Sequence, residues 1–420
     1  MSKMIIAGGS PKLKGEVLIE GSKNAVLPIL AATLLNGGIS VIKNCPKLRD
    51  VDITLKILIK LGCSVKIEKN AVIIDSSIIK STDIPVDLAT EMRSSIIFVG
   101  PMLSRCKKVA ISFPGGCEIG PRPIDLHIKA LRSMGAKILD AQGGFIYCSA
   151  DKLIGTDIHL GYPSVGATEN IMLASVFAEG ETYIHNAAKE PEIVDLQNFL
   201  KAMGADVSGA GTGIIHIKGV ERKLKDVEYT IMPDRIVAGT YMIASAMTGG
   251  EVILRNVEPE HLYSIISILN EAGSTIKVSK NTIKINGPGA NQAADIVRTL
   301  PYPGFPTDMQ APLVSLLSVA KGTSIVIETV FENRYKHVDE LMRMGANITI
   351  EGRIAVIKGV RCLNGATVYA RDLRGAASLV LAGLVAEGET VVEDIVHLDR
   401  GYEAMEVKLS QLGALIKREE

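Results

Sequence analysis

The stretch RMGANI at residues 343–348 decides the fold, because the same phrase recurs along the whole chain. The other five versions are KLGCSV at 60–65, SMGAKI at 133–138, AMGADV at 202–207, EAGSTI at 271–276 and QLGALI at 411–416. Their shared glycines lie roughly 70 residues apart, and this period fills all 420 residues. The sequence therefore predicts six copies of one structural repeat.

Each copy of the phrase lies between a helical pattern and a strand pattern. HVDELMRM (337–344) is amphipathic with the period of a helix, and ITIEGRIAVIKG (348–359) alternates as a β-hairpin does. The glycine between them is expected to be a helix C-cap in the left-handed conformation. A second phrase, such as FAEGETYIHNA (177–187), predicts another helix that ends at a glycine before a β-branched strand. In the second repeat MLSRCKKVAISF (102–113) lacks this glycine but keeps the strand.

A repeat of this length, with about two helices and several strands, is too long for an ordinary solenoid unit. It has the size of a small α+β subdomain. Six such subdomains can form one closed array or two clusters of three, and the repeat pattern alone leaves both arrangements open.

Composition excludes several classes of protein. Lys+Arg (46) and Asp+Glu (46) cancel, aromatic residues make up 4% and tryptophan is absent, so neither a basic nucleic-acid surface nor a base-stacking platform is expected. With 47% hydrophobic and 22% charged residues the chain lies outside the range of disordered proteins. A core built from Ile, Leu, Val, Met and Ala is therefore expected.

The cysteines indicate a reducing compartment. They contain no C-x-x-C pair, so they fit neither a disulfide framework nor a zinc site. The N-terminal stretch reaches glycines and charges after three apolar residues, unlike a signal peptide, and residues 376–386 are too few to span a membrane. We expect a soluble cytoplasmic protein. The six cysteines are Cys45, Cys63, Cys106, Cys117, Cys148 and Cys362.

Segments that interrupt the repeats are where we expect function. Ser22, Lys23 and Asn24 precede an apolar helix, and a helix start with an adjacent lysine can bind an anion. Spacing alone favours a different interpretation, in which Ser22 is an ordinary N-cap and Lys23 is solvated.

Cys117 is the most informative residue of the glycine-rich segment FPGGCEIGPRPIDLH (113–127). It follows a proline and two glycines, and Arg122 lies five residues further on. A thiol near arginines has a lowered pKa and can act as a proton donor or a nucleophile. An inert core cysteine is the alternative. Asp125 is expected to cap the helix that follows.

Asp308 follows a segment, 301–306, that contains three prolines and a glycine. It can cap the next helix, or the rigid segment can hold its carboxylate as a general base. Arg334 and Arg400 each follow a strand near a loop. Each can grip a phosphate or carboxylate with two hydrogen bonds, or form a surface salt bridge.

These residues lie in long motifs: GSKNAVLPIL, PGGCEIGPRPIDLH, SVGATEN, FPTDMQAP, FENRYKHVDELMRMGA and HLDRGYE. In these motifs the sequence resembles the enolpyruvyl transferases over nearly its whole length. The resemblance implies an α+β inside-out α/β barrel fold, with two similar domains of three βαβαββ-like repeats and a substrate cleft between them. It also implies that residues 1–22 plus 231–420 form one domain, and that 23–230 form an inserted domain carrying the Cys117 loop.

The resemblance further implies a reaction. The enolpyruvyl group of phosphoenolpyruvate passes to the 3'-hydroxyl of UDP-N-acetylglucosamine and phosphate is released, as the first committed step of cell wall peptidoglycan synthesis. No metal or organic cofactor is implied. Cys117 is expected to protonate the methylene carbon, to carry a covalent pyruvyl adduct, and to be alkylated by fosfomycin.

The resemblance assigns the remaining roles. Asp308 takes the proton from the sugar hydroxyl, and Lys23, Arg122 and Arg400 grip phosphoenolpyruvate. Asn24 contacts both substrates. The other expected substrate contacts are Arg93, Arg122, Pro123, Ile124, Asp125, Leu126, Ser164, Val165, Gly166, Val330 and Arg334.

Overall fold

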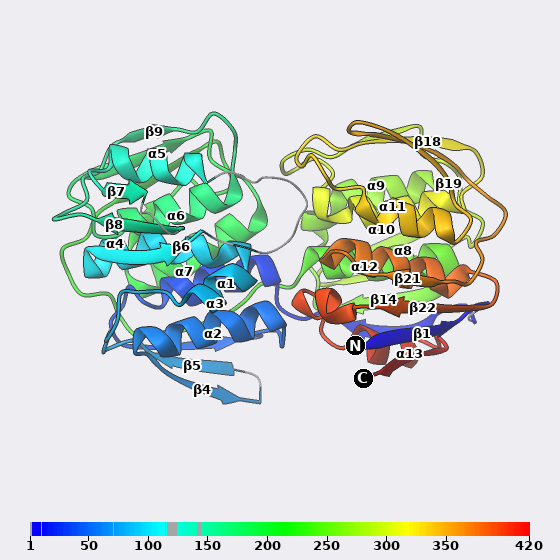
Figure 1. The fold of residues 1–420 in the computed structure, drawn as a ribbon, viewed down its shortest axis with the longest axis horizontal. Coiled ribbons are helices and arrows are strands. Elements are labelled where there is room, and N and C mark those ends of the chain that lie inside the picture. The colour runs from blue at the N-terminus through cyan, green and yellow to red at the C-terminus, as the bar shows by residue number, and fades with distance from the viewer. Residues whose placement is uncertain (1, 10, 70, 114, 116–123, 141–143) are drawn as a thin grey trace. The chain divides into compact units, whose positions relative to one another are not determined.

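The computed structural model describes residues 2–9, 11–69, 71–113, 115, 124–140 and 144–420. These residues form two compact units (Figure 1). Unit 1 contains the described residues of 2–20 and 233–420, and unit 2 contains those of 21–232. Cys117, Arg122 and Pro123 lie outside the described residues.

One repeat of unit 2 shows the architecture of all six. Strand β9 (Asp157–His159) leads through helix α6 (Val165–Ser175) to strand β10 (Glu181–His185), which pairs with it in parallel. Helix α7 (Pro191–Met203) then leads to the antiparallel hairpin of β11 and β12, which completes the sheet. Six small sheets of this kind, one for each repeat, confirm the predicted βαβαββ pattern. In the second repeat the outer parallel strand is reduced to a single bridge.

The other elements of unit 2 complete its three sheets, whose strand orders are β13-β3-β5-β4, β6-β8-β7 and β11-β12-β10-β9. The strands are β3 (Ile39–Lys43), β4 (Ser64–Glu68), β5 (Ala71–Asp75), β6 (Lys108–Ser112), β7 (Lys137–Asp140), β8 (Phe145–Ser149), β11 (Asp206–Ser208), β12 (Ile214–Lys218) and β13 (Val227–Thr230). The helices are α1 (Lys23–Ala32), α2 (Arg49–Leu61), α3 (Val86–Glu91), the 3-10 helix η1 (Arg93–Phe98), α4 (Val99–Cys106) and α5 (Asp125–Ser133).

Unit 1 has three sheets of four strands, ordered β15-β16-β14-β2, β17-β18-β20-β19 and β21-β22-β1-β23. The strands are β1 (Lys3–Ala7), β2 (Lys14–Leu18), β14 (Glu251–Arg255), β15 (Thr275–Ser279), β16 (Thr282–Asn286), β17 (Ile296–Arg298), β18 (Thr323–Ile327), β19 (Asn347–Glu351), β20 (Ile354–Lys358), β21 (Thr367–Tyr369), β22 (Glu389–Glu393) and β23 (Ile416–Glu419). The helices are α8 (Arg235–Thr248), η2 (Pro259–Leu262), α9 (Tyr263–Glu271), η3 (Thr307–Met309), α10 (Gln310–Ser318), α11 (Lys336–Arg343), α12 (Leu373–Val385), η4 (Ile395–Arg400) and α13 (Met405–Gln411).

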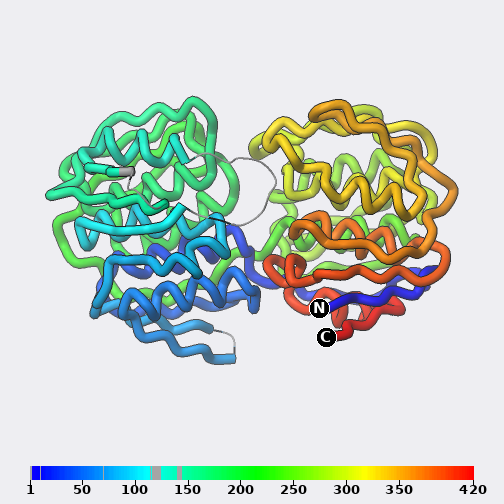
Figure 2. The backbone as a smooth tube through the Cα atoms, viewed as in Figure 1, coloured from blue at the N-terminus to red at the C-terminus, as the bar shows by residue number. Residues whose placement is uncertain are grey.

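Strands from the opposite end of the sequence complete the sheets of each unit. In unit 1, β1 pairs antiparallel with both β22 and β23, and β2 pairs in parallel with β14. In unit 2, β13 returns to pair in parallel with β3. Figure 2 accordingly shows the two chain ends close together in unit 1, where Lys3 faces Glu419.

The repeated glycines take the predicted conformation. All six have φ between 94° and 113°, in the left-handed region where a side chain is disfavoured. The glycine of the second phrase, which is missing before β6 in the second repeat, is replaced there by Lys107 with a φ of 63°. The helix therefore still ends there, at the cost of a non-glycine residue in a left-handed conformation.

The core of each unit is built around inner helices. In unit 1 α8, α10 and α12 pack on one another, and every residue of α10 is buried, as expected for a helix that is apolar on all sides. Unit 2 has its own apolar cluster, in which α4 packs on α6. No helix in the described ranges combines the length and hydrophobicity needed to cross a bilayer. The expected cytoplasmic location stays a prediction.

Candidate active site

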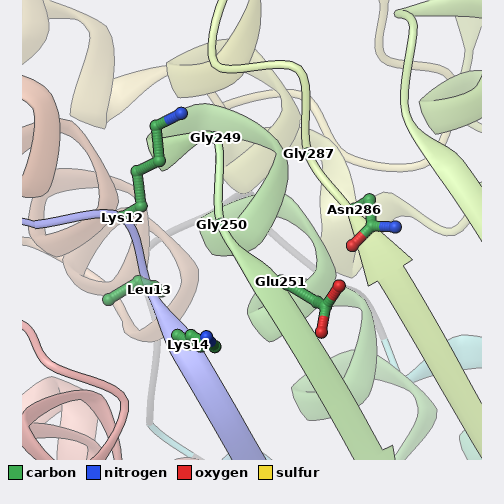
Figure 3. Close-up of a pocket in the computed structure, with 8 residues that line it drawn as sticks. All are labelled: Lys12, Leu13, Lys14, Gly249, Gly250, Glu251, Asn286 and Gly287. Carbon is green, nitrogen blue, oxygen red and sulfur yellow. The ribbon is translucent and has the colours of Figure 1, made fainter.

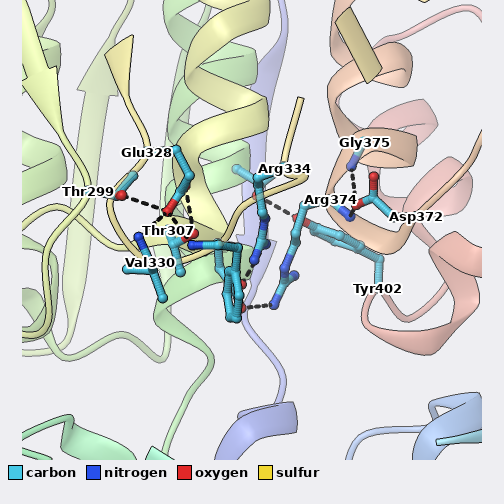
Figure 4. A network of polar contacts seen from close by, with 12 residues as sticks. Thr299, Thr307, Glu328, Val330, Arg334, Asp372, Arg374, Gly375 and Tyr402 are labelled. Atoms are coloured by element: carbon cyan, nitrogen blue, oxygen red, sulfur yellow. Dashed lines mark hydrogen bonds and ion pairs between the residues drawn. The ribbon is translucent and has the colours of Figure 1, made fainter. Parts of the chain in front are cut away.

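Asp308 is the centre of an ion-pair cluster in unit 1. Its Oδ1 accepts a hydrogen bond from Nη2 of Arg334 at 2.7 Å, and its Oδ2 accepts one from Nη2 of Arg374 at 2.9 Å. Figure 4 shows the side chains of Arg334 and Arg374 side by side. The capping alternative for Asp308 is wrong, because Met309 is the N-cap of α10 and Asp308 lies within η3.

The two arginines set the charge of this carboxylate. Burial alone would raise the pKa of Asp308, but Arg374 and Arg334 outweigh burial and hold the pKa well below its usual range. Burial also acts to lower the pKa of the Arg374 guanidinium, and the charge of Asp308 raises it instead. Asp308 and Arg374 are therefore held in their charged forms. In this arrangement Asp308 is a weak base.

Arg374 is a member of the cluster that sequence reasoning missed. It lies in the first turn of α12, where Oδ1 of Asp372 accepts hydrogen bonds from the backbone N–H groups of Arg374 and Gly375, both at 3.0 Å. Its guanidinium lies over the ring of Tyr402, with 5.5 Å between Cζ and the ring centroid. The sequence did contain a signal for Arg374, since it is the one arginine in the otherwise apolar helix of DLRGAASLVLAG (372–383). A charge buried in such a helix requires a partner.

Arg334 and Arg400 differ in burial. Arg334 is 4% exposed and its Cζ lies 5.1 Å from the ring centroid of Phe331, while the side chain of its partner Asp308 is 25% exposed. The ion pair is therefore largely buried, and the surface salt-bridge alternative is wrong. Arg400 is half-buried and ends η4, which packs against α12. The structure thus joins Arg334 directly to Asp308 and places Arg400 on an element that contacts the helix of Arg374.

Val330 follows β18 and is held by a buried acid. Its backbone N–H donates to Oε1 of Glu328 at 2.8 Å, and Oε2 of Glu328 accepts from the hydroxyl of Thr307 at 2.8 Å (Figure 4). Thr307 directly precedes Asp308 in the chain. Two predicted positions, Val330 and Asp308, are therefore connected through one side chain.

Lys23 begins α1 in unit 2 and is only 9% exposed. Its Nζ lies 2.9 Å from Oδ2 of Asp50, which is also buried. The side chain of Ser22 makes no capping hydrogen bond. The interpretation of a solvated lysine is thus wrong, and Ser22 is the N-cap residue of α1 without capping it through its side chain. Asn24 follows on the same helix and is half-buried.

Three elements of unit 2 meet around one buried histidine. His127 on α5 is 7% exposed, and its Nδ1 lies 3.0 Å from Nδ2 of Asn170 on α6. A Cβ on Gly166 would lie 3.3 Å from Cε1 of His127, so the absence of a side chain lets α6 approach the ring. Burial, and then the charge of Arg93 on η1, lower the pKa of His127 to about 4 against the opposing charge of Asp125. His127 and Asn170 lie within the recognised motifs but were not singled out.

The remaining predicted positions of unit 2 lie at the starts of α5 and α6. The Oγ of Ser164 caps α6 by accepting from the backbone N–H of Ala167 at 3.3 Å. Asp125 is exposed and is the first residue of α5, so the expectation that it caps this helix is wrong by one position. Half-buried against the core of unit 2 are Ile124, Leu126 and Val165.

Buried carboxylates gather near the start of α7. Glu169 on α6 and Glu192 on α7 are both buried. Burial, followed by the charges of Glu192 and Glu190, raises the pKa of Glu169 well above its usual range. Strongly perturbed acids are enriched at functional sites, so Glu169 joins the candidates of unit 2.

Two surface hollows lie away from these residues. The hollow of about 260 Å³ in unit 1 contains Lys12 and Gly249, the glycine that ends α8 (Figure 3). The hollow of about 730 Å³ in unit 2 contains Phe177, just after α6. Of the candidate residues that the structure describes, none lines either hollow. Several of them lie instead where inner helices begin, and helix N-termini favour anions.

Known proteins match the chain both in sequence and in fold. A sequence model of the family described as EPSP synthase (3-phosphoshikimate 1-carboxyvinyltransferase) matches residues 8–409. The chain is 54% identical over 418 residues to UDP-N-acetylglucosamine 1-carboxyvinyltransferase 2 of Caldanaerobacter subterraneus subsp. tengcongensis, with 100% of each chain covered. It is 52% identical over 418 residues to UDP-N-acetylglucosamine 1-carboxyvinyltransferase 1 of Carboxydothermus hydrogenoformans, covering 100% of this chain and 98% of the relative.

The fold is similar to solved enolpyruvyl transferases. The enolpyruvyl transferase NikO from Streptomyces tendae superposes with a TM-score of 0.90 at 22% identity, covering 99% of this chain and 98% of that one. EPSP synthase from Acinetobacter baumannii gives a TM-score of 0.74 at 21% identity, with 100% of both chains covered. The family match over residues 8–409, together with full-length relatives of more than 50% identity, shows that the chain belongs to the EPSP synthase family of enolpyruvyl transferases.

Proposed function

We propose that the chain transfers the enolpyruvyl group of phosphoenolpyruvate to the 3'-hydroxyl of UDP-N-acetylglucosamine and releases phosphate, the first committed step of peptidoglycan synthesis. The observation that carries this proposal is the 54% identity, over the full length of both chains, to a protein named UDP-N-acetylglucosamine 1-carboxyvinyltransferase. The burial of Lys23 and Arg334 supports it, because phosphoenolpyruvate is a small trianion that fixed positive charges must hold.

In this proposal Lys23, Arg122 and Arg400 hold phosphoenolpyruvate. Lys23 lies at the N-terminus of α1, where the helix dipole adds positive potential to its charge. The ion pair with Asp50 keeps the ammonium group in place until an anion arrives and competes for it. Asn24 lies one residue further along the same helix and contacts both substrates.

The nucleotide sugar is held by the other predicted positions. Arg93, the segments 124–126 and 164–166 and Val330 contact it in this proposal. The group around His127 supports the assignment for unit 2, because it already draws η1, α5 and α6 together. A neutral imidazole there can take part in hydrogen bonds without adding charge.

The chemistry begins at the methylene carbon. Cys117 donates a proton to that carbon, the neighbouring carbon becomes electrophilic, and the sugar 3'-oxygen adds to it. Asp308 takes the proton from the hydroxyl. The C–O bond to phosphate then breaks, the phosphate takes up the proton held by Asp308, and the Cys117 thiolate takes back one methyl proton, which restores the double bond.

Asp308 needs a change of partners to act as this base. Both of its oxygens are engaged by arginines, and its pKa is held well below the usual range by Arg374 and Arg334 against the effect of burial. It gains basicity when an anionic group of the substrate draws Arg334 or Arg374 away. Base activation is thereby coupled to anion binding.

The test is phosphate release by the purified chain with phosphoenolpyruvate and each of two acceptors. We expect release with UDP-N-acetylglucosamine and none with shikimate 3-phosphate, the acceptor in the name of the matching family. The Cys117→Ala variant, checked for folding by circular dichroism, should lose about 10³-fold in rate. Release with shikimate 3-phosphate alone, or full activity of the variant, would contradict the proposal. Fosfomycin should raise the mass of the peptide that contains Cys117.

A further inference from the structure

The residue after the central strand of each repeat occupies an equivalent place. In the first, third and fourth repeats it is an asparagine with φ between 54° and 57°. Each asparagine Nδ2 donates to the backbone carbonyl of the residue that follows the neighbouring parallel strand, which ties two strand ends together. The pairs are Asn44 with Ile231 at 2.9 Å, Asn186 with Leu160 at 2.8 Å, and Asn256 with Ile19 at 2.7 Å.

The fifth repeat departs from this pattern. Its equivalent residue is Glu328, after β18, and the neighbouring strand β17 is followed by Thr299. In this repeat Thr329 ties the two strand ends together, because its hydroxyl donates to the carbonyl of Thr299. Glu328 is therefore not needed for the strand tie, and a carboxylate cannot donate to that carbonyl.

Glu328 instead collects four donors while being 1% exposed. Its Oε1 accepts from the hydroxyl of Thr299 at 2.8 Å and from the backbone N–H groups of Val330 at 2.8 Å and Phe331 at 3.2 Å. Its Oε2 accepts from the hydroxyl of Thr307 at 2.8 Å. The buried carboxylate is thus satisfied entirely by two separate loops.

We propose that Glu328 is a positioning residue for the transfer reaction, fixing the segment of Asp308 and the loop of Val330 with one side chain. The inference rests on the proposed function. Thr307 is the neighbour of Asp308, and Phe331 lies under the guanidinium of Arg334. A displacement of about 1 Å in such groups can lower turnover about 10²-fold.

Three variants distinguish a positioning role of Glu328 in the reaction from a purely structural role in the fold. Glu328→Ala removes all four acceptor contacts, and kcat should fall about 10²-fold. Glu328→Gln should recover activity to within about fivefold of the unchanged chain, because the amide oxygen still accepts from both backbone N–H groups and the Thr307 hydroxyl can turn to accept from the amide. Thr307→Val breaks only the link to the Asp308 segment, and kcat should fall about tenfold with little change in KM.

Asn256→Ala is the matched control, because it removes the equivalent side chain of the fourth repeat and its strand tie. It should lower the melting temperature and leave the kcat of the folded protein within about twofold of the unchanged chain. If Glu328→Ala loses activity only in proportion to its folded fraction, as the control does, the positioning role is overturned. If Glu328→Ala does not fold, an unchanged kcat in Thr307→Val overturns it.

Hydrogen exchange separates this inference from the proposed function. In folded Thr307→Val the amides of residues 299–309 should exchange faster than in the unchanged chain, while those of β14 to β16 should not. Equal protection of residues 299–309 overturns the positioning role whatever the substrate is. Absence of phosphate release by the unchanged chain refutes the proposed function and leaves the exchange result to decide the role of Glu328.

Discussion

At the residue scale, Asp308 links charge to stability. Arg374 and Arg334 hold the pKa of the folded carboxyl well below its usual range, despite burial, whereas the unfolded value is about 3.9. The stabilisation is therefore complete above about pH 4 and is lost as the pH falls through the folded pKa. Asp308→Asn should lower the free energy of unfolding by about 2 kcal/mol at neutral pH. Melting curves should show that the difference in stability between the unchanged chain and Asp308→Asn becomes smaller below about pH 4. A difference that stays constant would contradict the low pKa of Asp308.

Two buried histidines should make stability depend on pH in a second window. Burial is the main cause that lowers the pKa of both His127 and His337 to about 4. Between about pH 6.5 and 4 the unfolded chain binds protons that the folded chain does not, so stability falls as the pH decreases. Each histidine accounts for up to about 3 kcal/mol across this window.

Calorimetry between these pH values tests the prediction. His127→Asn and His337→Asn should each flatten the decline, and the same substitution at the more exposed His216 is the control. A decline as steep in both buried-site variants as in the unchanged chain would rule out these histidines as its source.

At the element scale, the glycine caps make a graded prediction. Gly413 has a φ of 101°, and an added Cβ there would have no atom within 4 Å, whereas at Gly62 the Cβ would lie 2.7 Å from the backbone nitrogen of Lys80. Gly413→Ala should therefore cost about 1 kcal/mol from backbone strain alone, and Gly62→Ala clearly more. Lys107→Gly should act in the opposite direction. Urea unfolding measures all three, and equal losses at the two glycines would refute the steric argument.

The elements that could be predicted from the sequence are those with a local pattern. Outer helices such as α11 carry the helical period and a glycine stop, and the hairpins alternate, so both were expected correctly. Inner helices such as α12 are apolar on all sides, so their sequence does not indicate which face contributes residues to the site. Arg374 was missed because its partner, Asp308, lies 66 residues away in the chain. Pairings such as β1 with β22 have no local signal at all.

The candidate site was predicted less completely than the fold. The buried ion pair of Lys23 with Asp50 depends on two helices packing together, and neither residue alone signals it. Most of the expected roles came from motif resemblance. Physical reasoning on the isolated residues left capping and salt-bridge alternatives open, and only tertiary contacts such as those of Asp308 decided among them.

At the scale of the whole molecule, the two units should differ in their ability to fold alone. Unit 2 has its own apolar core, and its three sheets use only strands between Ile39 and Thr230. The fragment 21–232 should therefore fold with a cooperative thermal transition followed by circular dichroism. The fragment 233–420 lacks β1 and β2 and should not fold until a peptide of residues 1–20 is added. Cooperative folding of 233–420 without the peptide would contradict this.

Strand β1 is synthesised long before its two partners, β22 and β23, which lie near the other end of unit 1 in the sequence. Unit 2 is complete once β13 has emerged, but Lys3 must wait for Glu419. At usual rates of synthesis the wait of Lys3 for Glu419 lasts about 20–80 s. During that time Met4 and Ile6, which end in the core, are exposed on an unpaired nascent segment. The order of translation thus leaves β1 as an unpaired apolar strand that a chaperone would have to protect until β22 and β23 are made.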